Sequence, residues 1–171
     1  MNPSRILFVC TGNLCRSPMA AALFRAEAEK RGEQARFQVE SAGTWGVDGS
    51  PAAPFAQTVM AECGLSLAEH IARTVSREMI DEAAVILVMT QSHREALATE
   101  FPEADTKLHL MSELVGLEYD ISDPYGRSLE AYRLCADDLA QLIEQGYARV
   151  ELWLTRMQNA PKTQEPLYKR Q

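Results

Sequence analysis

The sequence RILFVCTGNLCRSP, residues 5–18, joins a short apolar strand to a turn and to the start of a helix. Residues 6–9 are wholly apolar, as expected of a strand that is buried on both faces of a sheet. Gly12 and Asn13 favour a tight turn, and Ser17 followed by proline is typical of the first turn of a helix. Such a loop directs successive backbone N–H groups at one point, at the positive end of a helix dipole. The stretch therefore predicts an anion-binding loop.

Two reactive side chains lie in this loop, Cys10 at its start and Arg16 six residues later. The loop amides and the Arg16 guanidinium favour the thiolate form of Cys10, which is the nucleophilic form. Arg16 also offers a planar fork of donors that matches two phosphate oxygens, and the amides of residues 11–16 fill the remaining directions. We therefore predict phosphoryl transfer through a phosphocysteine. The alternative is that Cys10 is an inert thiol buried at the end of a strand.

Strands and helices alternate along the rest of the chain. The apolar patterns predict strands at 37–39, 83–89 and 107–110, and helices at 17–30, 53–62, 92–101 and 128–145, with a short helical turn from Ser76. Loops are predicted at 42–52 and 112–127, and Gly146 is predicted to kink or end the last helix. This order predicts the α/β class, as a single domain with a four-stranded parallel sheet and helices on both faces. Ligands bind such sheets at the carboxyl ends of strands, where Cys10 lies. Residues 1–157 would form the domain, and 158–171 a polar, frayed tail.

Composition and charge argue against several classes of function. The chain has 171 residues, enough for one domain with a substantial core, and its 46% hydrophobic content is ordinary for a globular protein. The formal net charge of −7 argues against nucleic acid or an anionic membrane as a partner. Four cysteines without a paired framework, and no signal-peptide-like run, predict a cytoplasmic protein. No Cys/His spacing is typical of a zinc site, so we expect neither a metal nor a cofactor.

The loop and three later motifs resemble the low-molecular-weight protein-tyrosine phosphatases. Residues 9–20 fit the signature of that family, and the resemblance extends from about residue 5 to residue 146. The later motifs are Ser41-Ala42-Gly43, His70-Ile71-Ala72-Arg73 and Asp123-Pro124-Tyr125-Gly126. One departure is Ala21, where many relatives carry Glu, but this position lies on the first predicted helix, outside the loop. The resemblance implies a protein-tyrosine phosphatase that acts on phosphoproteins and binds phosphate or another oxyanion in the loop.

The resemblance also implies how the loop is built and held. The phosphate-binding residues would be Thr11, Gly12, Asn13, Leu14, Cys15, Arg16 and Ser17. Asn13 is predicted at positive φ, which Asn tolerates, and the resemblance implies that Ser17, Ser41 and His70 form hydrogen bonds around it. Ser17 has two interpretations, as the N-cap of the first helix or as a hydroxyl donor to the Cys10 sulfur. The resemblance favours the second.

Asp123 is the candidate general acid, because an aryl leaving group departs badly without a proton. An Asp-Pro pair alone would indicate a plain turn, but here it lies in a motif that resembles the acid loop of the phosphatases. The same carboxyl group would then act as the base on the hydrolytic water. Cys10, Arg16 and Asp123 are thus the predicted catalytic residues. Asp120 lies close in sequence, but its neighbours match no motif and it is left outside the site.

The pocket wall is predicted to consist of Leu14, Trp45 and Tyr125. The two aromatic side chains would stack on a substrate ring, or else belong to a small separate core. In the resembling family the tyrosine enzymes usually carry Ile at the position of Leu14 and the arginine enzymes carry Thr, so Leu14 favours phosphotyrosine. Residues 41–54 and the acid loop also resemble the bacterial arginine phosphatases, which makes a protein-arginine phosphatase the alternative.

The other cysteines and histidines bear on further alternatives. An arsenate reductase shares the scaffold but relays a disulfide through further cysteines in a mobile segment. Cys63 and Cys135 fall on or near predicted helices and residues 88–100 contain no cysteine, so this activity is less favoured. A phosphate-binding adaptor would lack the nucleophile or the acid. His93 and His109 are predicted to be structural or to face solvent.

Cys10 and Cys15 share one short loop and form a predicted redox pair. Oxidants attack the thiolate form of cysteine, and a Cys10–Cys15 disulfide would protect the nucleophile from irreversible oxidation. The alternative is that Cys15 simply packs beneath the loop.

Overall fold

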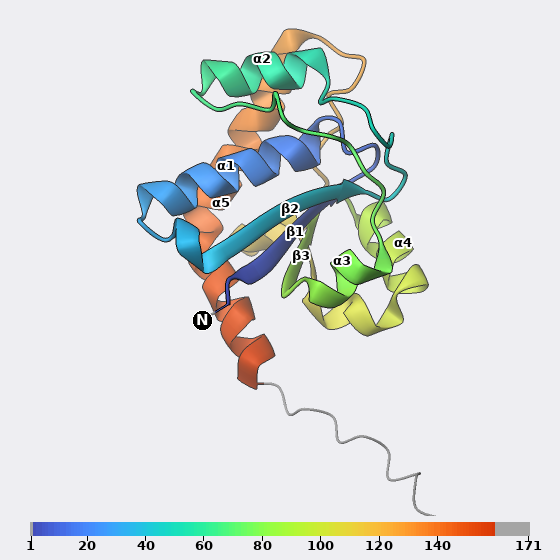
Figure 1. Ribbon diagram of the computed structural model, residues 1–171, viewed down its shortest axis with the longest axis vertical. Helices are drawn as coiled ribbons and strands as arrows, with labels where there is room; N and C mark the ends of the chain where they lie inside the picture. The colour runs from blue at the N-terminus through green and yellow to red at the C-terminus, as the bar shows by residue number, and fades with distance from the viewer. Residues whose placement is uncertain (1, 160–171) are drawn as a thin grey trace, which may run out of the picture.

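The computed structural model describes residues 2–159, and these residues form one α/β unit built on a parallel sheet (Figure 1). The strands are β1 (Ser4–Cys10), β2 (Phe37–Gly43), β3 (Val85–Val88) and β4 (Leu108–Leu110). They lie in the order β2-β1-β3-β4, and each neighbouring pair is parallel. The predicted four-stranded parallel sheet is therefore confirmed, with β1 at its centre.

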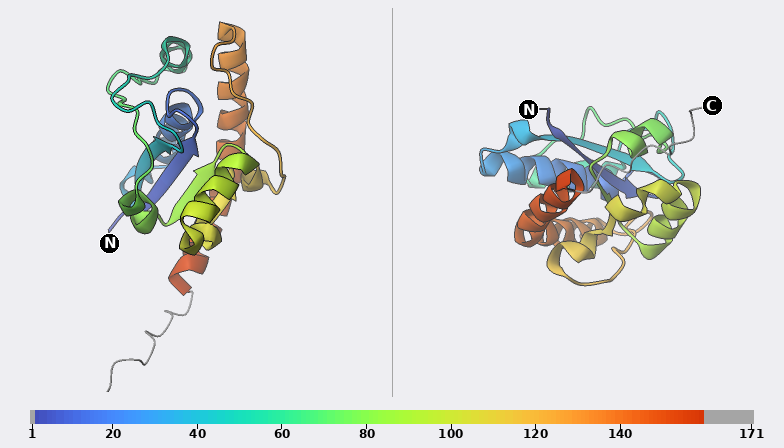
Figure 2. Two further views of the ribbon diagram at one scale, coloured as in Figure 1. Left: turned by 90° about the vertical axis from the view of Figure 1, so that its right-hand side faces the viewer. Right: turned by 90° about the horizontal axis from the view of Figure 1, so that it is seen from below.

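Helices cover both faces of this sheet, as predicted (Figure 2). The helices are α1 (Arg16–Lys30), α2 (Pro54–Glu62), α3 (Arg77–Glu82), α4 (Gln91–Glu100) and α5 (Leu129–Asn159). Three short 3₁₀-helices also occur, η1 (Gln34–Arg36), η2 (Pro102–Lys107) and η3 (Met111–Val115). The cores separate by face: Ile6 and Phe8 of β1 belong to the cluster with α1 and α5, whereas Leu7 and Val9 belong to the cluster with α3 and α4. Because successive strand side chains point to opposite faces, one apolar run supplies both cores.

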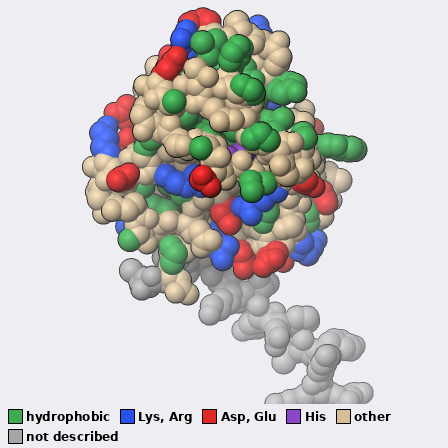
Figure 3. Space-filling model, turned by 45° about the horizontal axis from the view of Figure 1, so that its top comes forward, with side chains coloured by type: hydrophobic (Ala, Val, Ile, Leu, Met, Phe, Trp, Pro, Cys, Tyr) green, Lys and Arg blue, Asp and Glu red, His purple; other side chains and the backbone are tan. Residues whose placement is uncertain are grey.

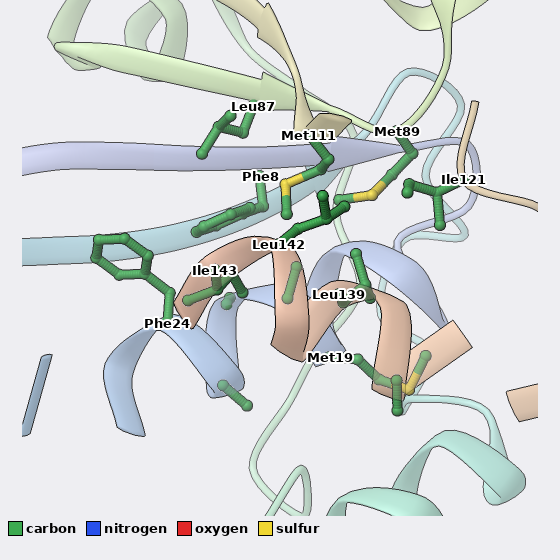
Figure 4. Packing of buried hydrophobic residues seen from close by; sticks show 14 of the residues in the cluster. Phe8, Met19, Phe24, Leu87, Met89, Met111, Ile121, Leu139, Leu142 and Ile143 are labelled. Carbon is green, nitrogen blue, oxygen red and sulfur yellow. The ribbon is translucent and has the colours of Figure 1, made fainter. Parts of the chain in front are cut away.

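The larger core lies between the sheet and the pair α1 and α5 (Figure 4). Phe8 on β1 faces Leu142 and Ile143 on α5, and all three are buried. Phe24 of α1 extends the cluster, with its ring stacked on Tyr147 at a centroid distance of 5.4 Å. This packing fixes α1 against the sheet, and the start of α1 is where the anion-binding loop ends.

The last helix is longer than the sequence indicates. Gly146 was expected to kink or end it, but α5 continues through Asn159. A Cβ atom added at Gly146 would lie 2.4 Å from the Leu114 Cβ, so this glycine permits the close approach of α5 to η3. The expected end at Gly146 is therefore wrong, because a glycine that allows close packing looks the same in sequence as one that ends a helix.

The chain end is only partly described. The predicted tail, 158–171, begins inside α5, and residues 160–171 lie outside the described residues. The domain boundary at residue 157 stays a prediction. Within residues 2–159, none of the helices combines the length and the apolar character that crossing a membrane requires.

Candidate active site

A tight loop joins β1 to α1 and carries the buried Cys10 at its start. The segment that follows β2 donates hydrogen bonds to the outer side of this loop. The Thr44 N–H donates to the Cys10 carbonyl at 2.9 Å, and the Trp45 N–H donates to the Thr11 carbonyl at 3.0 Å. Val47 N–H does the same for Gly12 at 3.1 Å. Because the N–H and C=O of a peptide unit point in opposite directions, carbonyls fixed outward leave the loop N–H groups for the inside.

Ser17 contacts the cysteine sulfur and does not cap the helix. Its Oγ lies 2.9 Å from the Cys10 Sγ, accepts a hydrogen bond from the Asn13 amide at 2.8 Å and lies 3.3 Å from the Ala42 carbonyl. The helix begins at Arg16, with Cys15 as the N-cap and no side-chain capping bond. A thiolate can only accept, so with Cys10 ionised the hydrogen bond must come from the Ser17 hydroxyl.

Asn13 holds the shape of the loop from a left-handed conformation, φ 59°, as predicted. Its amide nitrogen donates to the Ser17 and Ser41 hydroxyls at 2.8 and 3.0 Å. Its backbone carbonyl accepts from His70 Nε2 at 2.8 Å, so this ring nitrogen carries a hydrogen. Burial lowers the pKa of His70, which favours the neutral ring. The structure adds Arg73, whose backbone N–H donates to the Asn13 side-chain oxygen at 3.0 Å.

Arg16 is almost fully buried and held from two sides. Its Nη1 donates to the Ile121 carbonyl at 2.9 Å, and its Nη2 lies 3.5 Å from the Thr11 hydroxyl. Its Nε is buried and has no hydrogen-bond partner within residues 2–159. A buried donor of this kind needs an acceptor, and an oxyanion in the loop would supply one in the fork geometry that guanidinium prefers.

Asp123 reaches over the loop from the segment between η3 and α5. Its Oδ2 lies 3.3 Å from Arg16 Nη2, and its Oδ1 accepts from the Tyr125 N–H at 3.1 Å. Its side chain is 48% exposed, so it stands at the boundary between the loop and solvent. Asp120 instead accepts from the Gln91 N–H at 2.8 Å, at the start of α4.

A cavity of about 250 Å³ opens above the loop. Figure 3 shows hydrophobic side chains in several patches on the upper part of the molecule. The lining of the cavity includes the three predicted wall residues, Leu14, Trp45 and Tyr125, together with Cys10, Arg16 and Asp123. Trp45 and Tyr125 are 83% and 62% exposed, so they stand at the mouth rather than in a separate core. A larger cavity of about 670 Å³ lies where Ser41 and His70 support the loop, but it contains none of these reactive groups.

The remaining cysteines and histidines occupy different settings. The Cys15 Sγ lies 3.3 Å from the Tyr132 hydroxyl, and burial raises the pKa of Cys15 to about 11. His109 is structural, since its ring stacks on Trp153 at 3.8 Å. His93 does not face solvent: its ring is buried and contacts the loop at Thr11. No local signal points to that contact, which spans 82 residues.

Comparison with known proteins connects this geometry to one family. Residues 5–154 match the family described as low molecular weight phosphotyrosine protein phosphatase. The chain is 41% identical over 143 residues to a protein-arginine-phosphatase of Geobacillus stearothermophilus, covering 83% of this chain and 93% of the relative. It is 38% identical over 129 residues to the low molecular weight protein-tyrosine-phosphatase Wzb of Escherichia coli (strain K12), covering 75% and 83%. A crystal structure of a low molecular weight protein tyrosine phosphatase from T. tengcongensis matches with a TM-score of 0.81 at 38% identity, covering 85% of this chain and 99% of that one.

Proposed function

The chain belongs to the low molecular weight phosphotyrosine protein phosphatase family and is therefore a hydrolase, and we propose that it hydrolyses phosphotyrosine in proteins through a phosphocysteine on Cys10. The observation that carries this proposal is the grouping around one small cavity. The Cys10 sulfur is hydrogen-bonded to Ser17, and the Nε of Arg16 in the same loop has no hydrogen-bond partner among the described residues. Asp123 Oδ2 lies 3.3 Å from the Arg16 guanidinium. Nucleophile, anion-binding fork and proton donor are the three parts that this chemistry needs.

The first half of the reaction transfers the phosphoryl group to the enzyme. The Cys10 thiolate attacks phosphorus, so an S–P bond forms while the bond from phosphorus to the tyrosine oxygen breaks. Arg16 and the loop amides stabilise the negative charge on the equatorial oxygens. The protonated Asp123 carboxyl group gives its proton to the departing phenol oxygen, and tyrosine leaves neutral.

The second half returns the enzyme to its starting state. The Asp123 carboxylate takes a proton from a water molecule, whose oxygen attacks phosphorus as the S–P bond breaks. Inorganic phosphate leaves, and Cys10 is again a thiolate. The 2.9 Å contact with the Ser17 hydroxyl makes the sulfur a better leaving group, because that hydrogen bond stabilises the thiolate as it forms.

The direct test of this proposal compares phosphotyrosine and phosphoarginine peptides of the same sequence. Release of phosphate from the phosphotyrosine peptide with the higher kcat/KM supports the proposal. The second candidate is a protein-arginine phosphatase, which the 41% identity to a protein of that name favours. A wild-type preference for phosphoarginine would establish that candidate instead.

Leu14 provides the specificity prediction, because its side chain lines the cavity beside Cys10. An aliphatic wall gains about 25 cal/mol per Å² of buried ring surface from phosphotyrosine. Phosphoarginine keeps N–H groups beside phosphorus, and leaving one unpaired against that wall costs about 1–3 kcal/mol. In Leu14→Thr the ratio of kcat/KM values should therefore shift toward phosphoarginine by about 10-fold. Leu14→Ile is the matched control and should keep the wild-type ratio; an unchanged ratio in Leu14→Thr would remove Leu14 from the specificity wall.

Cys15 provides a redox prediction. After mild peroxide treatment the sulfenic acid on Cys10 should react with the Cys15 thiol, releasing water and forming a disulfide that dithiothreitol reduces. Inactivation should then become irreversible in Cys15→Ser. Cys135→Ser is the matched control, since Cys135 is also a buried thiol. Equal recovery of wild type and Cys15→Ser would show that Cys15 only packs against Tyr132.

We also propose that the protein acts in the cytoplasm. All four cysteines are free thiols, which fits a reducing compartment. Fractionation of cells that express the chain at native levels tests this, and recovery from an oxidising compartment would contradict it.

A further inference from the structure

His93 reaches from α4 back to the phosphate loop. It lies in the first turn of that helix, is only 6% exposed, and places its Nε2 2.8 Å from the Thr11 hydroxyl. Its other ring nitrogen, Nδ1, lies 3.0 Å from the Thr90 hydroxyl. Both ring nitrogens are therefore engaged, so the imidazole plane is fixed by the start of α4 on one side and meets the loop on the other.

The fold brings these groups together at the carboxyl edge of the sheet. β1 and β3 are parallel neighbours, with Val9 paired to Val88, so the residues that follow the two strands emerge side by side. Thr90 is the N-cap of α4 and accepts a hydrogen bond from the His93 backbone N–H at 3.2 Å. The same cap that begins the helix thus orients the histidine ring.

The Thr11 hydroxyl connects the histidine to Arg16, whose Nη2 lies 3.5 Å from the Thr11 Oγ1. Burial, and then the charge of Arg16, lower the pKa of His93 to about 4, so the ring is neutral near neutral pH. A neutral ring either accepts from the Thr11 hydroxyl or donates to it. In both arrangements the Thr11 oxygen keeps a lone pair for the guanidinium.

We propose that His93 is a positioning residue that holds the Thr11 hydroxyl against Arg16 and so aligns the guanidinium for the phosphoryl group; the inference rests on the proposed phosphatase function. Nη1 is fixed by the Ile121 carbonyl, and the Ile121 N–H donates at 2.8 Å to the carbonyl of Met89, the residue that follows β3. The Thr11 hydroxyl, at the end of the neighbouring parallel strand β1, holds Nη2 at 3.5 Å, and Asp123 Oδ2 lies 3.3 Å from the same nitrogen. With Nη1 and Nη2 both held, the guanidinium plane is fixed and the Nε–H bond of Arg16 points in one direction. Bidentate binding of an oxyanion requires such a fixed plane.

The test compares His93→Leu with His93→Gln, whose amide nitrogen can replace the Nε2 hydrogen bond. In His93→Leu we expect kcat/KM for p-nitrophenyl phosphate to fall about 10-fold and the Kd of inorganic phosphate, measured by calorimetry, to rise about 5-fold. His93→Gln should recover most of both losses. Thr11→Val should match His93→Leu, and the double variant should lose no more than either single one, because both substitutions break the same connection to Arg16.

The control is His109→Leu, which removes a half-buried imidazole that stacks on Trp153 away from the loop, and it should change neither quantity. Full additivity of the two single variants, or an equal loss in His109→Leu, would overturn the positioning role. If His93→Leu does not fold, Thr11→Val against Thr11→Ser tests the same contact, and a Thr11→Val enzyme equal to wild type overturns it. The Kd of inorganic phosphate distinguishes failure of the His93 role from failure of the phosphatase function. A wild-type protein without turnover would overturn the phosphatase function, and the Kd values of wild type and variants would still decide the role of His93.

Discussion

Replacing Cys10 by serine is expected to abolish turnover of p-nitrophenyl phosphate, lowering kcat by at least about 10⁴-fold, as loss of a nucleophile does in other hydrolases. The serine hydroxyl stays protonated in this loop and leaves poorly from phosphorus. Steady-state assays at high enzyme concentration would measure the residual rate.

Binding of an oxyanion should survive this change, because Arg16 and the loop amides remain. Calorimetric titration of Cys10→Ser with inorganic phosphate would show it. Cys63→Ser is the matched control: Cys63 is exposed at the end of α2, and its loss should leave kcat unchanged. Turnover by Cys10→Ser at the wild-type rate would exclude the phosphocysteine.

The second large effect is expected for Asp123→Asn, which keeps the shape of the side chain but cannot supply a proton. Turnover of phenyl phosphate, a substrate with a poor leaving group, should fall by about 10²–10⁴-fold. Turnover of p-nitrophenyl phosphate should fall far less, because p-nitrophenolate departs without protonation. The measurement is kcat/KM over a series of aryl phosphates, in which the dependence on leaving-group basicity should become steeper.

A matched control for the acid is Asp120→Asn. Asp120 lies in the same segment but accepts a hydrogen bond at the start of α4, so its loss should lower kcat/KM evenly across the series or not at all. An even loss across the series in Asp123→Asn as well would assign Asp123 a structural role, for instance through its hydrogen bond to the Tyr125 N–H.

The features that the sequence predicts well are those encoded over short distances. Residues 6–9 form a buried strand because every side chain is apolar, and Asn13 takes a positive φ because its neighbours require a turn there. The alternation of strands and helices is enough to predict a parallel sheet, since parallel strands need a crossover connection. These signals do not depend on where the rest of the chain lies.

The features that escape prediction depend on contacts across the fold. His93 looks like any histidine on an amphipathic helix, and only the pairing of β1 with β3 brings it to Thr11. Gly146 looks like a helix end until its neighbour Leu114 is known. Ser17 differs from these two cases, because its partners Asn13 and Cys10 are near in sequence; its residue type alone fits an N-cap, and the resemblance favours the contact with Cys10 that the structure has.

Asn13 has a consequence for how the chain is made. Its left-handed backbone is held by Ser41, His70 and Arg73, which lie 28, 57 and 60 residues further along. An isolated loop segment lacks those partners, so its conformational entropy would favour many other backbone conformations over that of the anion-binding loop. Translation delivers Cys10 before it delivers Ser41, His70 and Arg73. We therefore expect Cys10 to be unreactive in the emerging polypeptide and to become a reactive nucleophile only when these distant residues have folded against the loop.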